Sequence, residues 1–129
     1  MCTDRAHNAP TLTLPYWGGD LRGIMSDVLQ TLYDTICARK GESADSSYTA
    51  KLMHKGVPHI AKKLGEEAVE TALAAASGDR AETIKESADV LFHMEVLWAA
   101  MDIAPSDVWA ELERRAGVSG LVEKASRKE

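Results

Sequence analysis

The stretches KKLGEEAVE at residues 62–70 and ESAD at residues 86–89 carry acidic residues at helical spacing. Within each stretch two acids stand three residues apart: Glu67 with Glu70, and Glu86 with Asp89. On a helix such a pair shares one face, with Cβ atoms roughly 5–6 Å apart. The turn-like Ser-Gly-Asp at residues 77–79 lies between the stretches, and helices joined by a short turn run antiparallel. The sequence therefore predicts a helical hairpin whose two acidic pairs face each other.

The second helix of this hairpin is apolar around most of its circumference. From residue 87 to residue 101 it reads SADVLFHMEVLWAAM, in which only Asp89, His93 and Glu95 are ionisable. A helix with this pattern is buried on most sides, and the other helices of one chain are too few to cover it. We therefore expect an all-α helical bundle that is built around the acidic hairpin and completed by a homodimer.

The four carboxylates would repel one another inside such a hairpin. At a separation of about 4 Å and an effective dielectric constant near 20, each close pair costs on the order of 4 kcal/mol. Protons, arginines or a cation would have to offset that repulsion. Because all-oxygen ligation suits hard divalent ions, the sequence favours Mg²⁺, with Mn²⁺ as the alternative, over zinc. Magnesium held in this way typically also binds substrate phosphates, which indicates a phosphorylated ligand.

The remaining sequence indicates one helical domain with an extension before it. Residues 21–40 carry apolar side chains at helical spacing, residues 47–55 suit a short helix, and a last helix is expected at 104–115. Residues 1–20 contain turn-forming residues and show no periodicity. We expect a loosely ordered extension at residues 1–20 and an all-α domain at residues 21–129.

Composition argues against several classes of function. The net charge of −5 gives no general affinity for nucleic acid or for anionic membranes. The chain has no run of 18 apolar residues, so no membrane-spanning helix is expected. Two cysteines, Cys2 and Cys37, provide no disulfide framework and fit a reducing cytoplasm.

Three lysines are candidates for binding phosphate. Lys51 and Lys55 stand four residues apart on the short helix, whose free N-terminal N–H groups would also suit phosphate oxygens. The same two lysines would fit a solvated basic face. Lys63 lies on the acidic face, where an ion pair with Glu67 and a phosphate contact explain it equally well.

Two further residues of the hairpin have open roles. Glu66 is a candidate metal ligand, a candidate general base, or only a partner for Lys62. His93 follows Asp89 by one helical turn. It would either orient that carboxylate as an outer-shell partner of the metal, or pack as an ordinary hydrogen-bonded histidine.

The acidic pattern also resembles the signature of a known superfamily. Glu-Glu-x-x-Glu at 66–70, followed by Glu-x-x-Asp at 86–89, is similar to that of the all-α nucleoside-triphosphate pyrophosphatases. Within this superfamily the flanking sequence resembles one family, phosphoribosyl-ATP pyrophosphatase. The similar segments are SYTAKL (47–52), KG (55–56), KLGEE (63–67), ADVLFH (88–93) and GVSGLVEKASR (117–127). The resemblance covers roughly residues 47–127.

The resemblance implies a nucleotide-binding enzyme that hydrolyses the α–β phosphoanhydride of phosphoribosyl-ATP. The products would be phosphoribosyl-AMP and pyrophosphate, in the second step of histidine biosynthesis, and the enzyme would be a Mg²⁺-dependent homodimer. The expected metal ligands are Glu67, Glu70, Glu86 and Asp89, and the expected catalytic residues are Glu66, Glu67 and Glu70. The expected substrate-binding residues are Lys51, Lys55, Lys63, Lys124 and Arg127.

Two other functions fit the same residues. A house-cleaning (MazG-like) nucleoside-triphosphate pyrophosphatase would use the same acids to remove unwanted triphosphates. A non-catalytic helical dimer would instead use the acidic groove to bind a basic partner, and it would show no divalent-dependent hydrolysis.

Overall fold

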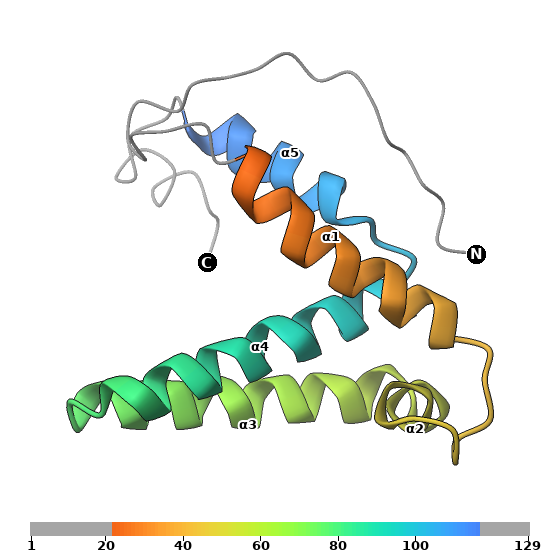
Figure 1. Ribbon diagram of the computed structural model, residues 1–129, viewed down its shortest axis with the longest axis horizontal. Helices are drawn as coiled ribbons and strands as arrows, with labels where there is room; N and C mark the ends of the chain where they lie inside the picture. The colour runs from red at the N-terminus through yellow and green to blue at the C-terminus, as the bar shows by residue number, and fades with distance from the viewer. Residues whose placement is uncertain (1–21, 117–129) are drawn as a thin grey trace, which may run out of the picture.

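The computed structural model describes residues 22–116. Five α-helices, joined by short loops, lie within this range. They are α1 (Arg22–Arg39), α2 (Tyr48–Lys55), α3 (Val57–Ala76), α4 (Arg80–Ala100) and α5 (Pro105–Ala116). No strand occurs within this range, so the all-α class expected from the sequence is confirmed. As Figure 1 shows, α3 and α4 lie side by side along the bottom of the molecule, and α1 and α5 lie above one end of them. The expected extension at residues 1–20 lies outside the described residues.

Local sequence explains how the hairpin of α3 and α4 forms. Gly78 adopts a φ of +77° after the end of α3, a conformation that glycine takes without steric cost. Asp79 then caps α4, because its Oδ1 accepts a hydrogen bond of 3.0 Å from the backbone N–H of Glu82. The carboxylate of Glu82 binds Lys85 at 2.8 Å.

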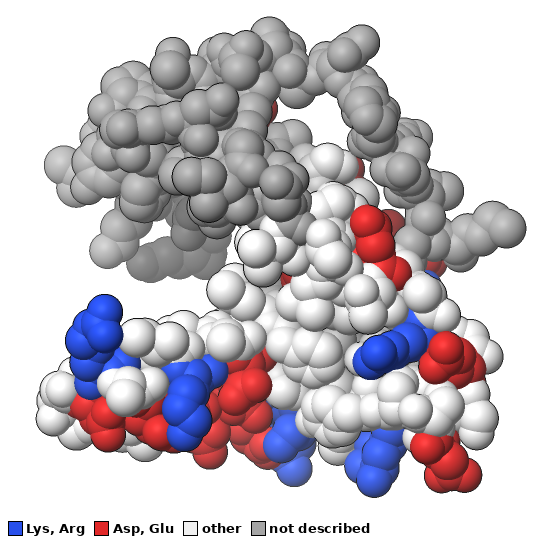
Figure 2. Space-filling model, in the orientation of Figure 1, with Lys and Arg blue, Asp and Glu red and all other residues white. Residues whose placement is uncertain are grey.

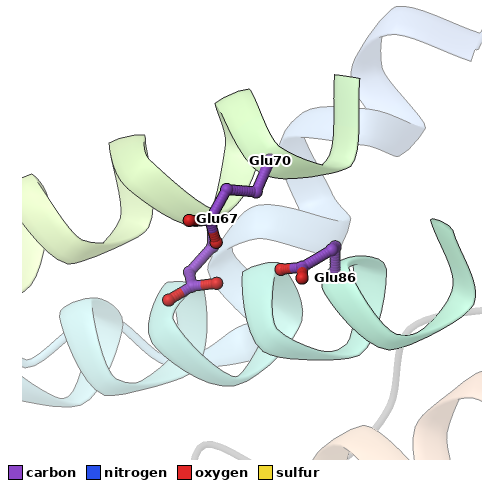
Figure 3. Close-up of side chains that lie close together, drawn as sticks. All are labelled: Glu67, Glu70 and Glu86. Atoms are coloured by element: carbon purple, nitrogen blue, oxygen red, sulfur yellow. The ribbon is translucent and has the colours of Figure 1, made fainter. Parts of the chain in front are cut away.

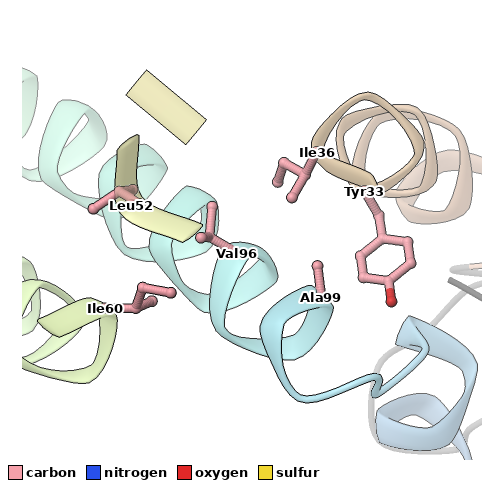
Figure 4. Close-up of a cluster of buried hydrophobic side chains, with 6 residues drawn as sticks. All are labelled: Tyr33, Ile36, Leu52, Ile60, Val96 and Ala99. Carbon is pink, nitrogen blue, oxygen red and sulfur yellow. The ribbon is translucent and has the colours of Figure 1, made fainter. Parts of the chain in front are cut away.

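The core lies where the hairpin meets α1 and α2 (Figure 4). All four of these helices contribute to it, through Tyr33, Ile36, Leu52, Ile60, Val96 and Ala99. Each of these side chains is at most 4% exposed. Burying a large aliphatic side chain in this way stabilises a fold by about 1.5–3 kcal/mol. The core thus holds one end of the hairpin, the end that carries the C-terminal half of α4.

Two polar contacts hold α1 against the segment that follows α4. The hydroxyl of Tyr33 donates a hydrogen bond of 2.7 Å to the carbonyl of Ile103. Lys40 binds the carbonyl of Ala99 at 2.7 Å and the carboxylate of Asp102 at 2.8 Å. A cation at a helix C-terminus satisfies carbonyl groups that lack a partner within the helix. These contacts fix α1 across the C-terminal end of α4.

The two halves of α4 differ in their burial, which the sequence pattern did not indicate. Val96 and Ala99 near the C-terminal end are fully buried, whereas Ile84 in the N-terminal half and Leu91 near the middle are 55% and 45% exposed. The first half of the helix projects beyond α1, so one chain leaves it partly uncovered (Figure 1). Dimerisation, which would cover it, stays a prediction. No described helix has the length and apolar character that crossing a bilayer requires.

Cys37 differs from the expectation of two reduced cysteines. It is partly buried and packs against the core cluster. It is not a free thiol in the structure. Free cysteines are among the most buried residues of proteins. The covalent state of Cys37, however, differs from the reduced thiol that the low cysteine count indicated.

Glu95 is the one acidic side chain of the described residues that is fully buried. It is 1% exposed, and neither of its carboxylate oxygens has a hydrogen-bond partner among the described residues. Burial first, and then the charge of Asp34 on α1, raise the pKa of Glu95 to about 7 from an ordinary value of 4.5. The folded protein therefore holds this proton more tightly than the unfolded chain does. The cost to stability appears as the pH rises above about 4.5 and is complete above about 7.

We expect replacement of Glu95 by methionine to stabilise the protein at pH 8. Methionine has a similar length and no group that needs a hydrogen bond, so the gain should be about 1–3 kcal/mol. At pH 5, where Glu95 is neutral in the folded state, the gain should be smaller. Urea unfolding of both proteins at the two pH values measures this difference. A gain that is equal at pH 5 and pH 8 would contradict the assignment of the cost to ionisation.

Candidate active site

Three carboxylates meet between α3 and α4 (Figure 3). Glu67 and Glu70 reach across from α3, and Glu86 reaches towards them from α4. One oxygen from each of the three carboxylates lies within 4.8 Å of those of the other two. Glu67 and Glu86 are partly buried and Glu70 is exposed, so the group is open to solvent on one side. Three of the four expected metal ligands are thus brought together.

The electrostatics of Glu86 show that this group lacks a counter-charge. Its Oε2 is buried and has no hydrogen-bond partner among the described residues. Loss of water around the carboxylate, followed by the neighbouring acids Glu82, Glu67 and Glu70, raises the pKa of Glu86 to about 7. Acids placed together in this way are stabilised by a cation that binds all of them. The donor set consists of carboxylate oxygens only, which fits a hard divalent ion such as Mg²⁺ or Mn²⁺.

Asp89 lies one turn beyond Glu86 but is exposed and is not among the three acids that meet. Its backbone carbonyl is instead bound to Nδ1 of His93 at 2.8 Å. His93 therefore contacts the main chain of Asp89, and no hydrogen bond joins the imidazole to the carboxylate that it was expected to orient. The role of Asp89 as a metal ligand stays a prediction.

Glu66 is neutralised by the two lysines that precede it. Lys63 binds one of its carboxylate oxygens at 2.8 Å, and Lys62 lies 3.8 Å from the other. The hydrogen bond from Lys63 holds the pKa of Glu66 below its ordinary value. Lys63 thus pairs with Glu66, not with Glu67 as the spacing of four residues had indicated. Basic and acidic side chains accordingly alternate along the hairpin on the face shown in Figure 2.

The lysines of α2 lie at the surface. Lys51 and Lys55 are both exposed, and neither is joined to an acid by an ion pair among the described residues. Ser47 caps the helix that carries them, because its Oγ accepts a hydrogen bond of 3.0 Å from the backbone N–H of Ala50. Both ammonium groups are therefore available to an anionic ligand. Lys124 and Arg127 lie outside the described residues.

Sequence reasoning missed the contact between Tyr48 and His93. The phenol oxygen of Tyr48, at the start of α2, lies 3.2 Å from Nε2 of His93 on α4. The Tyr48 ring stacks on Phe92 with ring centroids 6.0 Å apart. The apolar run that contains Phe92 and the motif that contains Tyr48 were both visible in the sequence. No local pattern, however, indicates that two segments 45 residues apart meet.

Comparison with known proteins gives a consistent result. A family model described as "Phosphoribosyl-ATP pyrophosphohydrolase" matches residues 29–116. The chain belongs to this family. As a member it is a hydrolase of a pyrophosphate bond. The matched range takes in α2, α3 and α4, and therefore all of the acids described above.

Individual relatives named phosphoribosyl-ATP pyrophosphatase match this chain along nearly their whole length. A phosphoribosyl-ATP pyrophosphatase from Parvibaculum lavamentivorans is 61% identical over 78% of this chain and 93% of that protein. One from Trichlorobacter lovleyi is 57% identical over 79% of this chain and 94% of that protein. One from Azospirillum brasilense is 51% identical over 81% of this chain and 95% of that protein.

We expect the three clustered carboxylates to bind a divalent cation directly. Replacement of Glu67 by glutamine removes a charged ligand. Loss of an outer-shell partner of a metal already costs about 10–100-fold in affinity, so loss of a direct ligand should cost at least as much. Mn²⁺ affinity should therefore fall by on the order of tenfold or more, as measured by calorimetric titration.

Replacement of Glu42 by glutamine is the matched control. Glu42 is exposed in the loop after α1, where the only hydrogen bond to its carboxylate from a described residue comes from Ser46. This variant should bind Mn²⁺ as the unmodified protein does. Equal loss in both variants, or no loss in either, would show that the carboxylates between α3 and α4 do not form the binding site.

Proposed function

We propose that this protein hydrolyses phosphoribosyl-ATP to phosphoribosyl-AMP and pyrophosphate, the second step of histidine biosynthesis. Membership of the family and the names of the relatives support this substrate. The observation that carries the proposal in the structure is the meeting of Glu67, Glu70 and Glu86, with a buried oxygen of Glu86 that has no partner among the described residues. Such a group suits a cation that also binds phosphate.

The three clustered acids would hold Mg²⁺, with Mn²⁺ as an alternative and Asp89 as the predicted fourth ligand. A divalent ion held there supplies Lewis-acid polarisation of the phosphoryl group and lowers the pKa of bound water. The chain's own residues then have two tasks, which are to neutralise charge on the phosphates and to accept the proton of the attacking water.

Lysines of α2 and α3 would neutralise the phosphates. Lys51 and Lys55 are exposed and have no acidic partner in an ion pair among the described residues, so binding an anion requires no existing pair to break. Lys63 is already engaged by Glu66 at 2.8 Å, so it would have to share its ammonium group between that carboxylate and a phosphate. Preorganised cations of this kind act where charge develops in the transition state.

The proton of the attacking water would pass to Glu66 or Glu67. The lysines lower the pKa of Glu66 and keep it ionised, which makes it available but weakly basic. Glu67 has no lysine partner at ion-pair distance among the described residues and lies within the acidic group. Of the two, Glu67 therefore has the surroundings that better suit a base, unless both of its oxygens bind the metal.

Pyrophosphate release from phosphoribosyl-ATP, with and without Mg²⁺, tests the proposal. We expect activity that depends on Mg²⁺ and that falls by at least about 100-fold on replacement of Glu70 by glutamine, since a ligand of the catalytic metal is lost. The Glu42→Gln variant should retain full activity.

A panel of ordinary nucleoside triphosphates identifies the alternative substrates. Faster turnover of these than of phosphoribosyl-ATP would favour the house-cleaning pyrophosphatase and overturn the proposed substrate. Full activity of Glu70→Gln would remove the metal assignment while leaving the substrate intact. Absence of divalent-dependent hydrolysis with every substrate would favour the non-catalytic dimer that binds a basic partner.

We also propose that two copies of the chain pair along the exposed part of the hairpin. Val69 and Leu73 on α3 are 60% and 65% exposed, and Ile84 and Leu91 on α4 are 55% and 45% exposed. Exposed apolar side chains on two packed helices favour association with another helical surface. The proposed assembly is the cytoplasmic homodimer that was expected from the sequence.

Replacement of Leu91 by lysine should shift the assembly towards the monomer, because a charge would be buried between the two copies. Replacement of Leu112 by lysine is the matched control, since Leu112 is 52% exposed on α5, away from the hairpin. Light scattering after gel filtration measures the mass of each variant. A dimer that persists in Leu91→Lys and dissociates in Leu112→Lys would place the interface on α5 instead.

A further inference from the structure

Tyr48 is an aromatic side chain with an exposed ring and a hydroxyl that is already engaged. Tyr48 is 51% exposed. It lies between Ser47, which caps α2, and Thr49, which is buried. One face of its ring stacks on Phe92, with an angle of 21° between the ring planes. His93 meets both rings edge-on, at interplanar angles of 84° and 82°. The ring is therefore held in place and is partly open to solvent.

The hydrogen-bond chain through His93 fixes which way the Tyr48 hydroxyl points. Nδ1 of His93 lies 2.8 Å from the carbonyl oxygen of Asp89, which can only accept a hydrogen bond. Nδ1 therefore carries the proton, and in the neutral imidazole Nε2 has only a lone pair to offer. The contact of 3.2 Å between Nε2 and the phenol oxygen is then a hydrogen bond donated by Tyr48.

A phenol that donates its only proton retains only acceptor capacity towards a ligand. Phosphate oxygens at neutral pH are mainly acceptors, so Tyr48 in this state has no proton to donate to a phosphate oxygen. Sugar hydroxyls and the exocyclic amino group of a purine are donors, and a purine base also stacks on an exposed aromatic face. The chemistry of Tyr48 thus suits a nucleoside and does not suit a phosphate.

Tyr48 also lies beside the groups that were assigned to the phosphates. Tyr48 stands three residues before Lys51 on α2, so the two side chains share one face of that helix. His93 follows Glu86 by two turns of α4, about 10 Å along the helix axis. That separation is comparable with the length of a nucleoside whose phosphate binds at the acids.

We propose that Tyr48, held by His93 and Phe92, is a specificity-determining residue that binds the nucleoside part of a nucleoside 5′-phosphate substrate. The ring stacks on the base, and the phenol oxygen accepts a hydrogen bond from a sugar hydroxyl or from the base. This inference rests on the proposed function, because it takes the substrate to be a nucleotide whose phosphates bind at the acidic group. His93 acts through Tyr48 and is a positioning residue.

Kinetics with phosphoribosyl-ATP give the first test. Tyr48→Phe loses one hydrogen bond and keeps the ring, so KM should rise about 3–10-fold while kcat changes by less than about twofold. Tyr48→Leu also loses the stacking surface and should raise KM on the order of 5–100-fold. Tyr48→Trp keeps an aromatic face and should recover most of the difference between the tyrosine and leucine proteins.

Tyr33→Phe is the matched control for loss of a tyrosine hydroxyl. The Tyr33 hydroxyl binds the carbonyl of Ile103 at 2.7 Å, in the core and away from the acids. This variant should lower the melting temperature and leave KM unchanged. A KM for Tyr48→Phe and Tyr48→Leu equal to that of the unmodified protein would overturn the proposal, as would a rise in KM for Tyr33→Phe as large as that for Tyr48→Phe.

Equilibrium binding separates this proposal from the proposed reaction. With Mg²⁺ present, Tyr48→Leu should weaken binding of AMP by on the order of 5–100-fold and leave binding of inorganic pyrophosphate unchanged. If phosphoribosyl-ATP is not hydrolysed but this difference in AMP binding is found, the proposed substrate fails and the role of Tyr48 stands. If AMP and pyrophosphate binding weaken equally, or neither changes, the role of Tyr48 is overturned whatever the substrate.

Discussion

Repulsion among Glu67, Glu70 and Glu86 is the constraint on which the arrangement of this protein depends. The packing of α3 against α4 brings their oxygens to within 4.8 Å of one another, and one buried oxygen has no protein partner among the described residues. An apolar interface alone would favour neutral side chains at these positions. Solvent reaches the site on one side, and the divalent cation proposed above would offset the remaining repulsion. The hairpin is thus both the main structural unit and the scaffold of the site.

The core and the acidic group lie at different places along the length of the hairpin. At one end Ile60 and Val96 pack with α1 and α2 in a core that excludes water. Towards the other end the two helices contact mainly each other and hold the acids (Figure 1). Sites on rigid helices are positioned more accurately than sites on loops. Because the core residues and the acids share the same two helices, the core orients the acids without contacting a ligand.

The helices and the acidic hairpin could be predicted from the sequence because their signals are local. Spacing of three residues paired Glu67 with Glu70, and the turn after α3 placed Glu86 opposite them. Three features could not be predicted, since they depend on tertiary contacts. Asp89 follows Glu86 at the same spacing at which Glu70 follows Glu67, yet it is not among the acids that meet, so spacing alone does not decide which acids come together. The burial of Glu95 and the contact of Tyr48 with His93 depend likewise on how α1 and α2 cross α4.

The single residue between α2 and α3 has a consequence for where α2 lies relative to the acids of α3. Gly56 ends α2 and precedes α3 with a φ of +89°, a backbone conformation that side-chain-bearing residues rarely adopt. With no other linker residue to absorb a change, the direction of one helix relative to the next is set by the φ and ψ of that one residue. Insertions at this joint would swing Tyr48 and the α2 lysines away from the acids together. The length of this joint therefore decides where the side chains of α2 lie relative to the acids of α3.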